Sequence, residues 1–116
     1  MRKLILHRQK ALACFAMKYH CIVNQDKECF LRELAALDQP VHLIDETDFA
    51  LRNGETIALP LSEDGCRFFV VACLNGWDLP TNEIVVEPGT DDVFYTVVTD
   101  FDGNRRLRIY VEPAKL

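Results

Sequence analysis

The strongest constraint on the fold is the pair Asp102-Gly103, which lies between two stretches of alternating apolar and polar residues. An Asp-Gly pair favours a two-residue type I′ hairpin turn, because both of its residues tolerate positive φ. Residues 91–112 are therefore predicted to form an antiparallel hairpin in which the numbers of paired residues sum to 205. Phe94 would face Val111 on the side of the hairpin that packs on the core.

The other side of this hairpin is predicted to combine tyrosine with arginine. Tyr95 would lie opposite Tyr110, with Arg106 and Arg108 on the same face. Tyrosine and arginine are enriched at protein interfaces, so these four residues are candidates for a binding surface. The alternative is a cross-strand tyrosine pair beside solvated arginines, or a face covered by a helix.

Several other segments also have strand patterns. Residues 66–74 are apolar at both odd and even positions, which is typical of a central strand covered on both faces. Residues 82–87 form a shorter candidate strand, and 41–44 form another after Pro40. A three-residue loop that ends at Gly54 in the left-handed region predicts a second hairpin between 47–51 and 56–59.

The first forty residues contain one ambiguous segment and one helix. Residues 11–23 are compatible with helix or strand, but the alternation from Phe15 onward favours a strand, with residues 3–8 as its partner. Residues 26–37 are predicted to form a helix that Asp26 caps and that ends before Pro40.

These elements predict the fold class. The chain has 116 residues, of which 49% are hydrophobic, which suits one domain over residues 1–116. Many short strands separated by turns favour a sandwich or a barrel. We expect a mainly β protein, an antiparallel β-sandwich of seven to eight short strands with one short inserted helix at about 26–37.

Charge and hydropathy bear on the partners and the compartment. The net charge of −5 makes a nucleic-acid partner unexpected, and no apolar run approaches about 18 residues, so no membrane partner is expected. The basic start is followed by only three apolar residues, which is too few for a signal peptide. Together with an odd count of five cysteines, this predicts reduced thiols and a cytoplasmic location.

A search for reaction chemistry finds no known constellation. The sequence has no phosphate-binding glycine loop, no H-E-x-x-H and no G-x-S-x-G. The cysteine spacings of seven, eight, thirty-seven and seven contain no C-x-x-C, so we expect buried structural thiols, no metal site and no cofactor. The acidic stretch 87–92 is interpreted as a solvated turn rather than a calcium loop.

Trp77 is the remaining candidate for binding. It lies in the segment 75–80, whose composition is typical of a loop. A loop tryptophan either plugs the open end of a sandwich or is an exposed anchor for a partner.

The arrangement of strands and turns around residues 12–75 resembles that of small bacterial PEGA-like β-sandwich modules. The resemblance rests on a first strand that ends at Asn24, the Asn-Gly-Glu turn at 53–55, the alternating strand 57–61 and the turn at Gly65. The Pro-Glu-Gly-Ala signature of that family is missing, and 25–48 has the character of an insertion. The resemblance implies a non-catalytic interaction or spacer domain, in a family that is mostly extracytoplasmic.

The sequence thus predicts a non-catalytic domain that binds another protein or itself, with a homodimer as one form. One alternative is a small-molecule-binding or enzymatic domain with its site near Trp77. A second alternative is a sensor that uses its thiols for metal binding or redox chemistry.

Overall fold

The computed structural model describes residues 2–36, 48–74 and 77–114, and the structural statements below concern these residues. Strands make up most of the regular structure in the described residues, which contain one helix, so the expectation of a mainly β protein with one helix is confirmed. The elements are β1 (Arg2–Arg8), β2 (Tyr19–Val23), α1 (Lys27–Ala35), β3 (Asp48–Leu51), β4 (Thr56–Leu61), β5 (Cys66–Leu74), β6 (Trp77–Pro80), β7 (Ile84–Val86), β8 (Val93–Phe101) and β9 (Leu107–Pro113).

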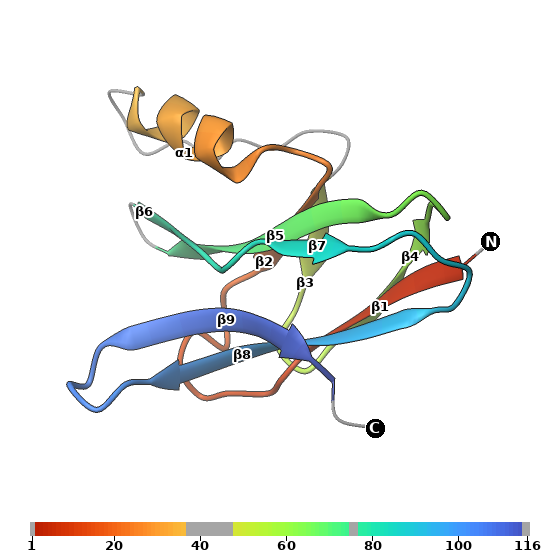
Figure 1. The fold of residues 1–116 in the computed structure, drawn as a ribbon. Coiled ribbons are helices and arrows are strands. Elements are labelled where there is room, and N and C mark those ends of the chain that lie inside the picture. The colour runs from red at the N-terminus through yellow and green to blue at the C-terminus, as the bar shows by residue number, and fades with distance from the viewer. Residues whose placement is uncertain (1, 37–47, 75–76, 115–116) are drawn as a thin grey trace.

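The strands form two sheets. The first, called the β8 sheet here, has the order β4-β1-β8-β9, and the second, the β5 sheet, has the order β3-β2-β5-β6 with β7 also paired to β5. Figure 1 shows the two sheets stacked on each other, with α1 on the outer side of the β5 sheet. Buried side chains from both sheets form one hydrophobic cluster, to which every strand of the β8 sheet contributes.

Strand β5 is covered on both faces, as its sequence predicts. Phe68 and Val70 belong to the cluster between the sheets, whereas Phe69 and Val71 point to the outer side and pack against α1. The ring of Phe30 on α1 meets the ring of Phe69 edge to face, with the centroids 5.4 Å apart. Residues at both odd and even positions of β5 are apolar because one set packs between the sheets and the other packs against α1.

Helix α1 begins directly after Asp26, the residue predicted to cap it. The Cys29 N–H donates to Asp26 Oδ1 at 3.1 Å, which satisfies one of the free donors at the helix N-terminus. Phe30 is buried on the face that meets the sheet. The candidate strand at 41–44 lies outside the described residues.

Two sequence predictions about strand partners are wrong. Strand β1 pairs with β4 and β8 rather than with β2, and its pairing with β8 is parallel, so the sheets are not purely antiparallel. The turn at Gly54 has the positive φ that was predicted, 76°, but it joins no hairpin. Strand β3 pairs with β2 and strand β4 pairs with β1, so this turn carries the chain from one sheet to the other.

The strand predicted from Phe15 begins only at Tyr19, because buried Arg8 shapes the preceding loop. The Arg8 guanidinium donates to the carbonyl oxygens of Cys14 at 2.8 Å and Met17 at 2.6 Å. Cys14 takes a φ of 61°, which bends the backbone out of an extended path. The alternating residues of this segment therefore form a loop, and their alternation does not correspond to the two faces of a sheet.

The β8–β9 hairpin forms, but its predicted register is wrong. Val97 pairs with Val111 and Phe101 with Leu107, so paired numbers sum to 208. The turn is a longer loop built on Asp102, whose Oδ1 accepts the N–H groups of Asn104 at 2.8 Å and Arg106 at 3.0 Å. The shift of three residues turns β8 over relative to β9, since side chains alternate along a strand, so Tyr95 and Val97 face the core in place of Phe94 and Val98, whereas Ile109 and Val111 face the core as predicted.

Candidate functional site

The changed register separates the hairpin residues that were expected to share one face. Tyr95 packs against the cluster between the sheets, with its ring centroid 5.5 Å from that of Phe68. Arg108 and Tyr110 lie on the outer face of the β8 sheet, and exposed Arg106 belongs to the turn rather than to the strand. The predicted four-residue surface is therefore not formed, although two of its members lie together.

Trp77 is the first residue of β6 and pairs with Leu74 of β5, so its backbone is strand rather than loop. The orientation of its side chain lies outside the described part of the structure. A binding role for Trp77 therefore stays a prediction.

Arg108 and Tyr110 form a small polar cluster with Asp100 of the neighbouring strand. The Arg108 Nη2 donates to Asp100 Oδ2 at 3.0 Å, and its Nε donates to Oδ1. The Tyr110 hydroxyl donates to Asp100 Oδ2 at 3.4 Å, and the guanidinium carbon of Arg108 lies 5.2 Å from the Tyr110 ring centre. The bidentate geometry fixes the arginine against the sheet.

The electrostatics of this cluster follow from its contacts. The hydrogen bond from Arg108 holds the pKa of Asp100 below its ordinary value, and the same bond raises the pKa of Arg108. Partial desolvation raises the pKa of Tyr110, and the negative charge of Asp100 raises it further. The cluster is neutral overall and stays so across the physiological pH range, which suits a contact surface better than a proton-transfer site.

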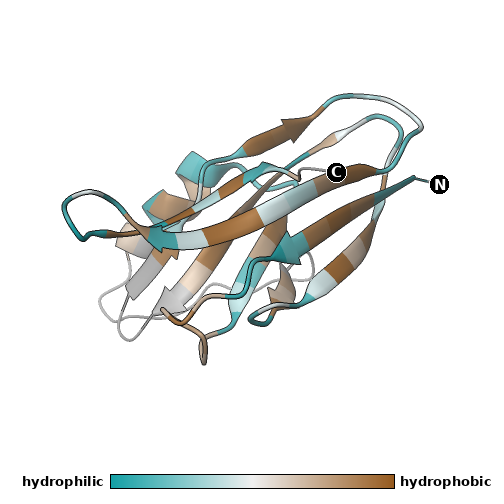
Figure 2. Cartoon of the chain, turned by 90° about the horizontal axis from the view of Figure 1, so that it is seen from below, coloured by the Kyte–Doolittle hydropathy of each residue, from teal (hydrophilic) through white to brown (hydrophobic). Residues whose placement is uncertain are grey.

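The polar cluster borders an apolar area on the outer face of the β8 sheet. Ile5 of β1 pairs with Phe94 of β8, and Val98 of β8 pairs with Tyr110 of β9, so all four side chains share this face. Phe94 is 39% exposed. Figure 2 views the molecule from below, with the β8 sheet in front and α1 behind. The helix covers the β5 sheet only, and no described element covers this face of the β8 sheet.

Three edge strands, in contrast, contain a proline that hinders pairing with another strand. Pro60 on β4, Pro80 on β6 and Pro113 on β9 each lie on an edge strand. In β6 and β9 the residue after the proline donates its N–H inward, Thr81 to Val70 and Ala114 to Phe94, so each proline takes the position whose N–H would point outward. A proline there removes a donor that a foreign strand would need.

Asn82 also protects the edge at β9. Its side-chain amide accepts the Val111 N–H at 2.9 Å and donates to the Val111 carbonyl at 3.0 Å. These two bonds occupy the outward backbone groups of Val111 and link the edge of the β8 sheet to the segment between β6 and β7. Contact between two copies of the chain is therefore favoured on a sheet face rather than at these edges.

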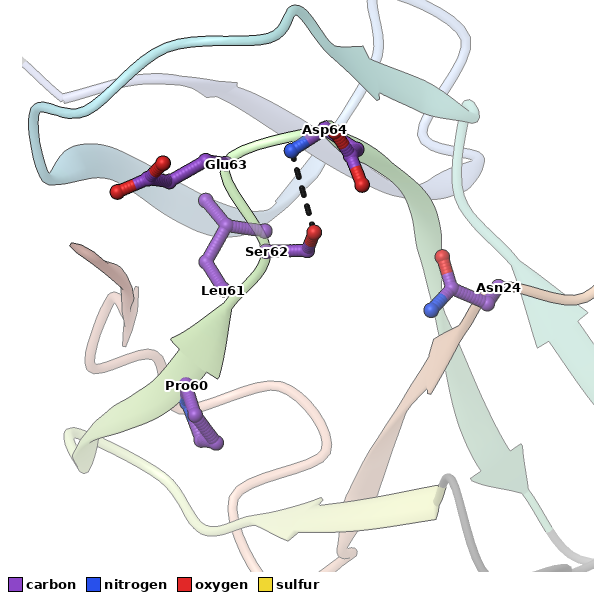
Figure 3. A pocket seen from close by; sticks show the side chains of 6 residues that line it. All are labelled: Asn24, Pro60, Leu61, Ser62, Glu63 and Asp64. Atoms are coloured by element: carbon purple, nitrogen blue, oxygen red, sulfur yellow. Dashed lines mark hydrogen bonds between the residues drawn. The ribbon is translucent and has the colours of Figure 1, made fainter. Parts of the chain in front are cut away.

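A recess lies beside the end of β4, at the opposite end of β5 from Trp77. It has a volume of about 740 Å³ and is lined by the residues shown in Figure 3, namely Asn24, Pro60, Leu61, Ser62, Glu63 and Asp64. A smaller apolar chamber of about 200 Å³ adjoins it, with Phe49 and Cys66 in its wall. The recess is a shallow polar mouth over a small apolar chamber.

The turn at the mouth of the recess is fixed from below. Arg2 Nε donates to the Ser62 carbonyl at 3.1 Å, and its Nη2 donates to the Glu87 carbonyl at 2.7 Å. Gly65 has a φ of 93°, and an added Cβ there would lie 2.3 Å from the Val86 carbonyl oxygen. Burial raises the pKa of the Cys66 thiol despite the opposing influence of Arg2, so this cysteine stays protonated and is a poor nucleophile.

The other described thiols and histidines lie in several different parts of the fold. Cys21 is buried as expected, but Cys29 is exposed on α1, which corrects the expectation that all thiols are inside. Cys29 is exposed because it lies on the solvent side of a helix whose opposite face meets the sheet. His7 is hydrogen-bonded to Thr56 Oγ1 at 2.8 Å. Within the described ranges, no group of three or more His, Cys, Asp or Glu side chains could hold a metal ion.

Comparisons with known proteins give no relative. The chain matches no protein-family model, no curated protein and no solved structure. The resemblance to PEGA-like modules therefore stays a prediction. Among the described residues, no helix has the length and the apolar character needed to cross a membrane.

Proposed function

We propose that this protein is a non-catalytic β-sandwich domain that associates with a second copy of itself through the outer face of the β8 sheet. The observation that carries the proposal is the difference between the two sheets. Helix α1 covers the outer face of the β5 sheet, whereas the equivalent face of the β8 sheet has no cover in the described structure. That face bears Ile5, Phe94 and Tyr110, which are side chains that gain from burial.

The sandwich part of this proposal is supported by the hydrophobic cluster that both sheets share. The free thiols of Cys14, Cys29 and Cys66 support a reducing, cytoplasmic location as part of the same proposal. The resemblance to bacterial PEGA-like modules agrees with a domain that works by binding.

The size of the face determines the strength of association we expect. Four strands about 4.8 Å apart and roughly seven residues long present an area of about 20 by 20 Å. This is smaller than the roughly 800 Å² per partner that is typical of stable complexes. We therefore expect a dimer in reversible exchange with monomer, with a dissociation constant on the order of micromolar.

Sedimentation velocity across a dilution series tests the proposal, with Phe94→Glu as the variant. Phe94 is already 39% exposed in the monomer, so we expect the substitution to leave the fold intact while it places a charge in the apolar area of the face. We expect the native chain to shift from dimer towards monomer on dilution and Phe94→Glu to remain monomeric throughout.

Val85→Glu is the matched control. Val85 is 63% exposed, and it lies on β7 in the other sheet, so the same change there should leave the dimer unaffected. A native chain that is monomeric at every concentration would contradict the proposal, as would a dimer that Phe94→Glu does not weaken.

A second candidate function is the binding of a small apolar molecule in the recess beside β4. The apolar chamber of about 200 Å³ favours it, since small-molecule sites combine apolar walls with a few polar groups at the mouth. Leu59 lines this chamber, and Leu59→Phe should fill it. If this function is right, small hydrocarbons should raise the melting temperature of the native chain but not that of Leu59→Phe. A native chain that small hydrocarbons do not stabilise would contradict it.

A further inference from the structure

The loop between β1 and β2 is apolar over its whole central part. Residues 11–17 read Ala-Leu-Ala-Cys-Phe-Ala-Met. Leu12 is 94% exposed and Phe15 is 63% exposed. Figure 2 shows this loop as a brown segment that projects beyond the strands it connects. An exposed apolar patch on a loop marks a contact with something outside the folded chain.

The loop has a defined conformation. Arg8 holds the carbonyl groups of Cys14 and Met17, and the Ala11 N–H donates to Asn53 Oδ1 at 3.0 Å. The backbone beneath the two large side chains is therefore fixed by the fold. Leu12 and Phe15, called the loop tip here, are presented to the outside at little entropic cost on binding.

Three exposed cations are called the basic collar here: Lys10 and Lys18, which flank the loop tip along the chain, and Arg52, which precedes Asn53 in the wall of the hollow beside it. Lys10 lines the same hollow of about 390 Å³ as the two residues of the loop tip. Tyr19 pairs with Leu51, and extending this register by one residue places Lys18 opposite Arg52.

No ion pair joins the basic collar to an acidic side chain among the described residues, and the neighbouring Glu55 carboxylate accepts the Arg52 backbone N–H at 3.3 Å. The ion pairs among the described residues join Arg67 to Asp26 and Arg108 to Asp100, and none involves the collar. Like charges directly opposite each other across strands destabilise a sheet, so this arrangement lowers the stability of the chain alone. This local cluster of positive charge contrasts with the net charge of the chain, which is −5.

We propose that the loop tip inserts into an anionic lipid surface while the basic collar lies against the charged headgroups. Such a surface offers an apolar layer beneath an anionic layer, which is the order in which this loop presents its side chains. A chain without a membrane-spanning segment can still bind a lipid surface, because peripheral insertion needs only a short apolar loop. The lipid surface is a binding partner distinct from the second copy proposed for the β8 sheet.

Vesicle co-sedimentation tests this inference with the full chain. The probes are vesicles of phosphatidylcholine alone and vesicles in which roughly one-third of the lipid is phosphatidylserine. We expect binding to the anionic vesicles only, weaker at high salt because the Debye length falls. Leu12→Ser and Phe15→Ser should each lower the partition coefficient by about tenfold or more, because each removes a side chain that enters the apolar layer.

Matched controls separate insertion from unfolding. Val85→Ser changes a side chain that is 63% exposed, as Phe15 is, but lies on β7, and it should bind as the native chain does. Lys18→Glu should weaken binding while the thermal stability of the chain stays equal or rises, because the new glutamate lies opposite Arg52. Lys3→Glu, an equal charge change at the start of β1, should have the smaller effect on binding.

Three results would overturn the inference. One is the absence of binding to anionic vesicles, and another is binding that survives both substitutions in the loop tip. The third is a Leu12→Ser variant that loses self-association but keeps vesicle binding, which would show that the loop contacts protein rather than lipid. Phe94→Glu should retain vesicle binding, so failure of the dimer proposal and failure of the lipid proposal are distinguishable.

Discussion

The guanidinium carbon of Arg8 lies 3.4 Å from the centre of the Tyr19 ring. Arg8 is 1% exposed and donates to three backbone carbonyl groups, those of Cys14, Met17 and Leu51. Tyr19 in turn is hydrogen-bonded through its hydroxyl to Thr99 at 2.8 Å. The pair therefore joins the loop after β1, the β5 sheet and the β8 sheet at one point.

Replacement of Arg8 should destabilise the fold strongly. Arg8→Met keeps part of the apolar stem but leaves three carbonyl groups without donors, and we expect a loss of about 3–5 kcal/mol in the free energy of unfolding. Urea denaturation measures this loss. A change below about 0.5 kcal/mol, within the range of ordinary surface substitutions, would show that the guanidinium contacts do not hold the loop.

Gly65→Ala should also be costly, for a different reason. Gly65 has a φ of 93°, and an added methyl group would clash with the Val86 carbonyl oxygen. We expect a loss of about 2–4 kcal/mol. Gly103→Ala is the matched control, because nothing lies within 4 Å of a Cβ added at Gly103, and its stability should stay near that of the native chain. Equal effects of the two substitutions in urea denaturation would contradict the turn geometry.

The pair of Asp100 and Arg108 predicts a pH dependence. Because the hydrogen bond from Arg108 lowers the pKa of Asp100 in the folded chain, the pair contributes stability above the ordinary aspartate pKa of about 3.9. That contribution is lost as the pH falls through the lowered pKa of the folded state. The stability difference between the native chain and Asp100→Asn should therefore shrink in acid. A difference that grows as the pH falls would have the wrong sign.

The thiols should differ in their reactivity with Ellman's reagent. Cys29 is exposed, whereas Cys66 is partly buried and burial raises its pKa. We expect a fast phase that disappears in Cys29→Ser and persists in Cys66→Ser, and a slow reaction of Cys66 that accelerates at alkaline pH. Rapid modification of Cys66 at neutral pH would instead favour the thiol-sensor function. Metal analysis of the purified chain tests the metal form of that sensor.

The elements that sequence reasoning found are those determined by local chemistry. Residues 66–74 are apolar at both parities, which predicts β5, and the side chain of Asp26 is suited to cap α1. The Asp26 cap involves neighbouring residues only, and the burial of both faces of β5 requires apolar residues at every position. Both features can therefore be read from the local sequence.

The errors arise where a distant side chain decides the backbone. Arg8 turns residues 11–17 into a loop, although their alternation is compatible with a strand. At the hairpin, Asp102 and Gly103 are the right residues for a two-residue turn, but the Asp102 carboxylate accepts two N–H groups and stabilises a longer one. The residue with positive φ in this turn is Arg105 rather than Gly103, and a non-glycine residue rarely adopts positive φ.

The candidate surface was recovered only in part for the same reason. Arg108 and Tyr110 were identified because tyrosine and arginine are typical of interfaces, and they do lie on the uncovered face. Phe94 was assigned to the core because the register differs by three residues. The exposed loop tip gave a readable signal, an apolar run at 11–17, but that run is equally typical of a buried strand.

The most direct test of the proposed association is a series of ¹H–¹⁵N correlation spectra recorded at increasing protein concentration. If two copies meet through the β8 sheet, the amide shifts of Ile5, Phe94 and Tyr110 should move together with concentration while those of α1 stay constant. Shifts that are confined to α1 or β7, or spectra that do not change at any concentration, would contradict the claim that this uncovered face is the interaction surface.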